Sequence, residues 1–142
     1  MRRLDFFVAG VPAAQGSKRH VGGGKMIESS KSLAPWRATI ISEAVQANTE
    51  KVRLTGPINL GLTFYFPRPV SHYGTGRNAG KLKPLVSPYK SSRPDIEKLC
   101  RAVCDALVQS GALQDDGQVV ILHAKKLYGH PHGVRVIVSD AF

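Results

Sequence analysis

Two pairs of acidic residues lie close together in a chain that is otherwise strongly basic. Asp95 and Glu97 are separated by one residue, and Asp115 and Asp116 are adjacent. Grouped carboxylates repel one another unless a cation joins them. Their oxygens are hard ligands, which suit Mg²⁺ or Mn²⁺ rather than zinc. If the two pairs meet in the folded chain, they would form a site for a divalent cation.

A metal site in a basic protein predicts chemistry on a phosphate backbone. Cationic surfaces bind polyanions, and a bound cation can activate a water and neutralise charge at a phosphate. Arg101 lies one helical turn beyond Glu97, where its charge could stabilise the transition state. The alternative is a helix whose acids only favour its N-terminus and form the surface ion pairs Glu97–Arg101 and Arg101–Asp105. The spacing alone leaves both interpretations open.

The segment between the two acid pairs has the periodicity of a helix with one buried face. Its apolar residues recur with three-four spacing, at positions 96, 99, 100, 103, 104, 107 and 108. Asp95 suits the cap or first turn of this helix, and Pro94 suits its first turn. Gly111 suits its C-terminal end. A short connection after Gly111 would bring Asp115 and Asp116 back toward the same pocket.

The overall composition favours a nucleic-acid partner. The 142 residues include 20 Lys and Arg against 10 Asp and Glu, which gives a net charge of +10. That imbalance predicts attraction to nucleic acid more readily than a merely soluble basic protein. With no apolar run of about 18 residues and no signal-peptide pattern, we expect a cytoplasmic protein without a membrane partner. Cys100 and Cys104, on the apolar face of the helix, suit a reduced compartment.

Two stretches concentrate basic residues outside the regular elements. Residues 14–25 form a glycine-rich loop, which is either flexible or binds phosphates through N–H groups and cations. Residues 68–93 form a loop so long that it is either mobile or functional. Tyr73 and Tyr89 lie among its cations, as in surfaces that bind nucleic acid by stacking and charge. The candidate DNA-binding residues of the two stretches are Lys18, Arg19, Lys25, Arg77, Lys81, Lys83, Lys90 and Arg93.

The remaining elements follow from periodicity and turn residues. The alternation of apolar residues predicts a strand over 58–66, and shorter patterns predict strands at 4–8, 119–128 and 134–138. A helix begins near Ser30 or Ser32 and ends around Asn48; its Trp36 suits the core better than a base-stacking platform. The order predicts an α+β fold in one domain over residues 1–142, with a small mixed sheet packed against two helices.

The segment from Arg93 to Asp116 resembles the signature of the RusA family of Holliday junction resolvases, which are small phage and bacterial endonucleases. That signature is an Asp-x-Asp-Asn-Leu-x-Lys run, then Asp-Ala-Leu, a glycine and an Asp-Asp pair. At matching spacing the chain has Asp95-Ile96-Glu97-Lys98-Leu99-Cys100-Arg101, Asp105-Ala106-Leu107, Gly111 and Asp115-Asp116. Glu97, Lys98 and Arg101 stand where the family has Asp, Asn and Lys. Segments 12–19 and 58–66 resemble the family less specifically.

The resemblance implies a Mg²⁺-dependent nuclease, with Mn²⁺ as a substitute, that acts as a homodimer on four-way DNA junctions. It implies a phage- or prophage-encoded protein in the cytoplasm of a bacterial host. Asp95, Glu97 and Asp116 match the metal-binding and catalytic carboxylates. Arg101 matches the catalytic lysine, and Asp115 would assist at the metal. The three differences from the signature leave an alternative: a branched-DNA-binding protein of the same fold whose cleavage is weakened or lost.

Overall fold

The computed structural model of the protein describes residues 2–16, 18–20, 26–28 and 31–142. Its elements follow the predicted order, with one hairpin added, and confirm the α+β class. Three short 3-10 turns, η1 (Val70–His72), η2 (Gly76–Asn78) and η3 (Asp116–Gln118), lie between the larger elements. Those larger elements are β1 (Arg3–Ala9), β2 (Lys18–His20), β3 (Met26–Glu28), α1 (Leu33–Ala47), β4 (Ile58–Phe66), α2 (Ile96–Gln109), β5 (Val119–Tyr128) and β6 (Gly133–Asp140).

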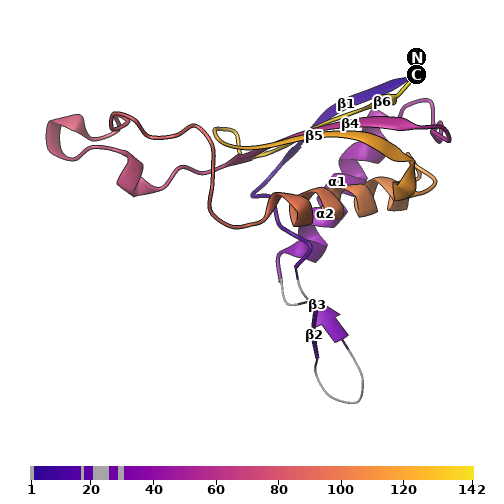
Figure 1. Ribbon diagram of the computed structural model, residues 1–142, viewed down its shortest axis with the longest axis horizontal. Coiled ribbons are helices and arrows are strands. Elements are labelled where there is room, and N and C mark those ends of the chain that lie inside the picture. Colours follow the sequence, from indigo (N-terminus) through magenta and orange to yellow (C-terminus); the bar gives the residue numbers. More distant parts are fainter. Residues whose placement is uncertain (1, 17, 21–25, 29–30) are drawn as a thin grey trace.

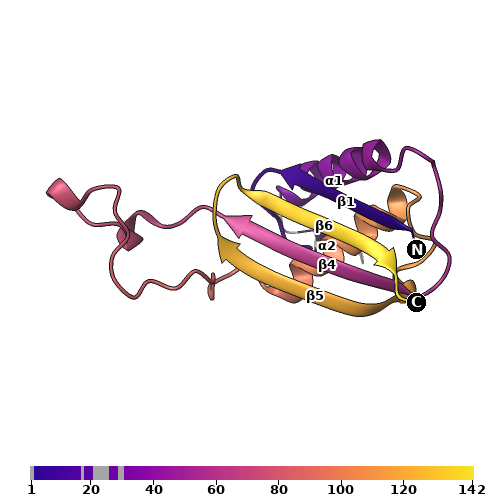
Figure 2. The same cartoon turned by 90° about the horizontal axis from the view of Figure 1, so that it is seen from above.

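Four strands form one mixed sheet in the order β1-β6-β4-β5. β6 pairs antiparallel with β1 and with β4, whereas β4 and β5 run parallel. Parallel neighbours need a long crossover, so the chain leaves β4 through the long loop and returns through α2 to β5. Both helices lie on the same side of the sheet, and the other side is open (Figures 1 and 2). Neither helix in the described part of the chain is long and apolar enough to cross a bilayer.

The core fills the space between the sheet and the helices. Along β4 every second residue is buried, as the alternation predicts. Trp36 of α1 is only 5% exposed and belongs to this core, which confirms the preferred interpretation of that residue. The strand residues of the core include Phe6, Val8, Ile58, Leu60, Leu62, Phe64, Phe66, Val134, Val136 and Val138. The helix residues include Ile40, Ala44, Leu99, Val103, Ala106 and Leu107.

Helix α2 lies close to where its sequence predicts it. Asp95 is its N-cap residue, so Pro94 precedes the helix instead of lying in its first turn. Ser110 is the C-cap residue, and Gly111 follows it with φ +86, a left-handed conformation that glycine adopts at little cost. The helix therefore presents one buried side to the sheet and leaves the other side, with Glu97 and Arg101, exposed.

A hairpin of β2 and β3 begins within residues 14–25, which were expected to be a loop, and ends just after them. The two strands pair antiparallel over three residues each, from Lys18 opposite Glu28 to His20 opposite Met26, and they project from the body of the molecule (Figure 1). Such short strands have no periodicity that a sequence pattern could reveal. Of Lys18 and Arg19 only the backbone is described, and Lys25 lies outside the described residues, so their phosphate contacts stay a prediction.

The long loop between β4 and α2 extends far from the sheet (Figure 1). Backbone bonds within the loop join Gly74 N to Lys81 O and Lys83 N to His72 O, both at 2.9 Å. Its return segment 88–90 pairs with the outer edge of β5 near the end of that strand, through the bridge between Tyr89 and Leu127. The loop is therefore attached to the sheet at both of its ends.

Candidate active site

The predicted acidic residues lie at the exposed surface around α2. Asp95 is at its N-cap, Glu97 is in its first turn, and Asp115 and Asp116 lie in the turn that leads through η3 into β5. All four are exposed. Enzymes that act on small molecules usually bury them in a concave pocket. Exposed carboxylates on one helix and its neighbouring turn instead suit a large substrate.

Asp95 has a carboxylate that is not used to cap its helix. Its side chain makes no capping hydrogen bond, and it is 53% exposed with Lys98 Nζ at 3.8 Å from Oδ2. The first helical bond instead runs from Leu99 N to the backbone oxygen of Asp95, at 3.1 Å. The helix dipole favours negative charge at this end. The Asp95 carboxylate is thus available to a cation.

A lysine of β5 holds the segment that leads into α2. Lys126 Nζ donates to the carbonyl oxygens of Ser92 and Pro94, each at 2.8 Å. Burial lowers the pKa of Lys126, the charge of Lys90 lowers it further, and the charge of Asp95 opposes them. Lys126 has no sequence signal that predicts this contact. Only the folded path of the loop brings the two carbonyls to it, and no local pattern signals that path.

The Asp115–Asp116 turn is fixed by side-chain bonds. The Asp115 carboxylate accepts from a backbone N–H within the turn at 3.1 Å, and Gln118 Oε1 accepts from Asp115 N at 2.8 Å, which forms a capping box. Gln118 Nε2 donates to the carbonyls of Leu54 and Gly56 at 2.8 and 3.0 Å. Asp115 therefore has a structural use, and the Asp-x-x-Gln spacing was the signal that could have shown it.

The two acid pairs lie at different positions along the axis of α2. Burial is the main cause that raises the pKa of Cys104 to about 11, and the charge of Asp116 contributes. Asp95 is the N-cap residue of α2, whereas Asp116 lies beyond the C-terminal end of this helix, in the turn that leads into β5. Among the described residues, no three Asp, Glu, His or Cys side chains are grouped closely enough to hold a metal ion. The acidic residues are therefore spread along α2 and do not form a closed metal-binding site.

The donor set nevertheless suits Mg²⁺. This ion usually keeps several waters and takes one or two carboxylates together with substrate phosphates, rather than an all-protein cage. Asp95 and Glu97 offer two exposed carboxylates at the start of one helix. They could hold such a cation once a phosphate supplies further oxygens.

Arg101 is exposed on the outer side of α2, one turn after Glu97. The ion-pair interpretation of this face expected Arg101 to bind Glu97 and Asp105. Instead, Asp105 Oδ2 lies 3.9 Å from Nη1 of Arg37 in α1. Of the ion pairs within the described ranges, none includes Glu97 or Arg101. The charges on this side of α2 are therefore not explained by pairing with one another.

The predicted DNA-binding residues of the long loop lie along its whole length. Four of them, Arg77, Lys81, Lys83 and Arg93, are exposed. Lys90 is half-buried, because its Nζ lies 5.4 Å from the ring centre of Phe66 and donates to Ser92 Oγ at 2.9 Å.

A cation–aromatic cluster at the foot of the loop was not predicted. The Arg68 guanidinium lies 4.8 Å from the ring centre of Tyr128, and the His72 ring meets that tyrosine edge to face at 5.2 Å. Arg68 also donates to Ser87 O at 3.0 Å. Tyr128 is the last residue of β5, and Arg68 comes shortly after the end of β4. The cluster therefore forms only because these two strands pair in parallel, and sequence spacing does not reveal that pairing.

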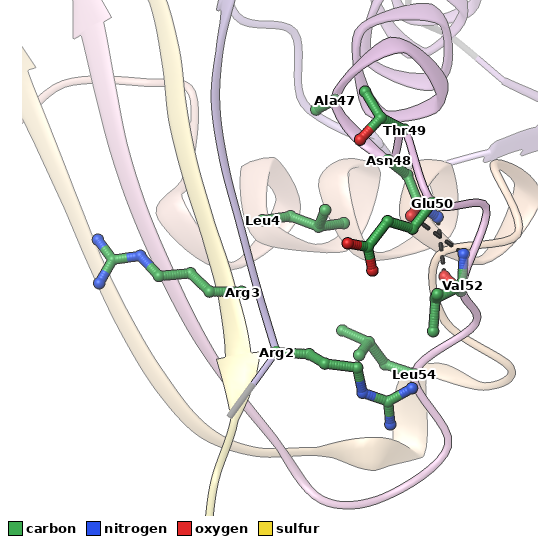
Figure 3. A pocket seen from close by; sticks show the side chains of 9 residues that line it. All are labelled: Arg2, Arg3, Leu4, Ala47, Asn48, Thr49, Glu50, Val52 and Leu54. Atoms are coloured by element: carbon green, nitrogen blue, oxygen red, sulfur yellow. Dashed lines mark hydrogen bonds between the residues drawn. The ribbon is translucent and has the colours of Figure 1, made fainter.

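Two hollows in the surface lie away from these residues. One, of about 300 Å³, is lined by the start of β1, the end of α1 and residues 50–54 (Figure 3). The other, of about 360 Å³, lies between the end of α1 and the turn after α2. None of the predicted site residues lines either hollow. Among the described residues, the predicted acids and Arg101 thus lie on the exposed surface and outside both of these hollows.

Comparison with known proteins shows the family to which the chain belongs. Among curated proteins there is no match. The family model described as "Endodeoxyribonuclease RusA" matches residues 9–139, which is nearly the whole chain and includes both acid pairs. That match extends well beyond the segment on which the resemblance was first recognised, so the chain belongs to the endodeoxyribonuclease RusA family.

Proposed function

We propose that the protein is a Mg²⁺-dependent endonuclease that resolves four-way DNA junctions by paired hydrolysis of phosphodiester bonds. The observation that carries this proposal is a set of exposed carboxylates around α2 in a RusA-family chain with a net charge of +10. The basic residues would bind the phosphate backbone, and the acids would bind the cation at the cleaved phosphate. The match to an endodeoxyribonuclease family supports the reaction class.

The residues of α2 and its neighbouring turn have separate roles in this proposal. Asp95 and Glu97 bind the cation together with phosphate oxygens. Asp116, which lies after the end of α2 and is not grouped with them among the described residues, is the third acid that matches the family signature, and the Asp116→Asn variant tests its contribution. When bound, Mg²⁺ or Mn²⁺ lowers the pKa of the attacking water and neutralises charge at the phosphate. Arg101 stabilises the charge that develops on the phosphate in the transition state. Asp115 assists by keeping Asp116 in place.

We propose further that two copies act together as a homodimer. A four-way junction resolved by paired nicks needs two active sites, and a two-fold protein supplies them. The first half of the edge strand β5 supports this idea, because it exposes Val120, Ile121 and Leu122 by 61%, 40% and 48%. Exposed apolar residues on an unpaired strand edge are common where another chain binds.

A junction-cleavage assay tests the nuclease proposal. Wild-type protein is mixed with a synthetic four-way junction in Mg²⁺, in Mn²⁺ and in a chelator, beside Asp116→Asn. We expect paired nicks with either metal, none with the chelator, and a loss of about 10²-fold or more in Asp116→Asn. Glu50→Gln is the matched control, since it makes the same change in net charge at an exposed acid that lines a surface hollow.

The alternative is a branched-DNA-binding protein of the same fold with weakened or absent cleavage. It is favoured by Glu97, Lys98 and Arg101, which differ from the family signature, and by the lack of a closed acid cage among the described residues. Junction binding that weakens steeply with salt, without nicks in either metal, would select it. Absence of Mg²⁺-dependent nicking by the wild type would defeat the catalytic proposal.

A further inference from the structure

We propose that Lys126 is a positioning residue of the acidic site: its ammonium group holds the backbone just before Asp95 and thereby fixes the direction of the Asp95 carboxylate. This inference deepens the proposed function and rests on it. Lys126 lies in β5, outside the segment between the two acid pairs.

The register of the sheet places Lys126 on the side that faces α2. Lys126 lies opposite Phe64 of β4, which is fully buried, and Lys125 lies opposite Thr63. Successive residues of a strand point to opposite faces, so Lys126 lies on the helix side and Lys125 on the open side. The two lysines are adjacent and carry the same charge, yet only one of them can reach the start of α2.

The loop segment before α2 runs along β5 and then bends around the Lys126 ammonium. Tyr128 N donates to Pro88 O at 2.9 Å, and Lys90 N donates to Lys126 O at 3.0 Å, so main-chain bonds join the two segments. Beyond them, Lys126 Nζ bonds the carbonyls of Ser92 and Pro94, at 2.8 Å each. Lys126 thus contacts the loop through its backbone and through its side chain, and the side-chain contacts end one residue before Asp95.

Asp95 depends on this support because its own side chain has little. It makes no capping bond, it is 53% exposed, and its ion pair with Lys98 is long, at 3.8 Å. The direction of its carboxylate therefore depends mainly on the backbone that leads into α2. Without Lys126, the carbonyls of Ser92 and Pro94 would lose a charged donor, and residues 92–95 would sample other conformations. Groups that orient metal-binding side chains typically change metal affinity or activity about 10- to 100-fold when they are removed.

Lys126→Met and Lys125→Met, compared side by side, test this role. Each removes one positive charge and keeps most of the aliphatic stem. We measure amide hydrogen exchange over residues 92–97, Mn²⁺ affinity by calorimetry, junction affinity without metal, and the nicking rate at saturating junction. For Lys126→Met we expect faster exchange over 92–97 and about 10- to 100-fold losses in Mn²⁺ affinity and nicking rate. Junction affinity should fall equally in both variants, because each loses one charge.

Unchanged exchange over 92–97 in Lys126→Met would overturn the proposal, and so would losses of Mn²⁺ affinity and nicking that equal those of Lys125→Met. These results differ from a failure of the nuclease proposal. In that case the wild-type protein would neither bind Mn²⁺ nor nick the junction, whereas the exchange comparison would still show whether Lys126 holds the segment before Asp95.

Discussion

Along α2, residues that are neighbours in the sequence lie in two different environments. Leu99, Val103 and Leu107 are completely buried against the sheet. Glu97 and Arg101, on the other side of the same helix, are exposed and belong to none of the ion pairs found among the described residues. The buried, inner side of α2 stabilises the fold by removing apolar surface from water. The charged residues on its exposed, outer side make no such contribution. We therefore expect the functional residues of α2 on its exposed side.

The largest expected effect on stability comes from the inner side. Leu107→Ala should lower the free energy of unfolding by about 3 kcal/mol, since it removes buried methyl groups and leaves a cavity. Denaturant titration measures it, and Val70→Ala at an exposed position of the long loop is the control, with a change below about 0.5 kcal/mol. The nicking rate per folded molecule should stay the same in Leu107→Ala. A large change in that rate would show that the two sides are not separable.

Arg101→Lys tests the outer side, with a smaller effect in free energy. An ammonium can transfer a proton, whereas a guanidinium stays charged, so we expect the nicking rate to rise by up to about tenfold, or about 1.4 kcal/mol. The free energy of unfolding should not change. The control is Arg37→Lys, at the arginine whose partner is Asp105. A lower rate in Arg101→Lys would mean that the planar guanidinium itself contacts the phosphate.

The smallest expected change in stability comes from removing an ion pair on the open side of the sheet. This pair has a structural role only. Arg135 bonds Asp5 through Nε–Oδ1 and Nη2–Oδ2, at 3.1 and 2.8 Å. The hydrogen bond from Arg135, followed by the charges of Arg135 and Arg3, holds the pKa of Asp5 below its ordinary value. A lowered pKa in the folded state stabilises the fold above the ordinary carboxyl pKa, and that stability is lost as pH falls through the lowered value.

Asp5→Asn should therefore lower the thermal midpoint slightly at pH 7, far less than Leu107→Ala does. The difference from wild type should shrink from about pH 4 downward, as the carboxyl is protonated. Thermal unfolding at several pH values measures it, with nicking unchanged at pH 7. A difference that does not depend on pH would assign the effect of Asp5→Asn to packing instead of charge.

Sequence reasoning predicted the elements whose own residues repeat with a period. The three-four spacing of α2 and the alternation of β4 are consequences of one buried side, so they are readable without the fold. The hairpin of β2 and β3 was missed, because three residues per strand are too few to alternate. The family match confirms the recognition made from the acid pairs and their spacing.

The parts of the site that were missed depend on contacts between distant segments. Lys126 lies 32 residues after Pro94, whose carbonyl it binds, and Gln118 lies 62 residues after Gly56. Both residues lie in or just before β5, so the strand beside the helix supports both acid pairs. A spacing rule within one helix cannot reveal such support, because it arises only when the parallel crossover is complete.

The long loop has one further consequence, for how the protein can change over evolutionary time. Its side chains between 75 and 85 are all exposed, and its turns are closed by bonds within the loop, such as Lys81 N to Asn78 O at 3.1 Å. Substitutions and insertions there cost the domain little free energy. The loop can therefore accumulate mutations over generations while the sheet and the two helices are inherited unchanged.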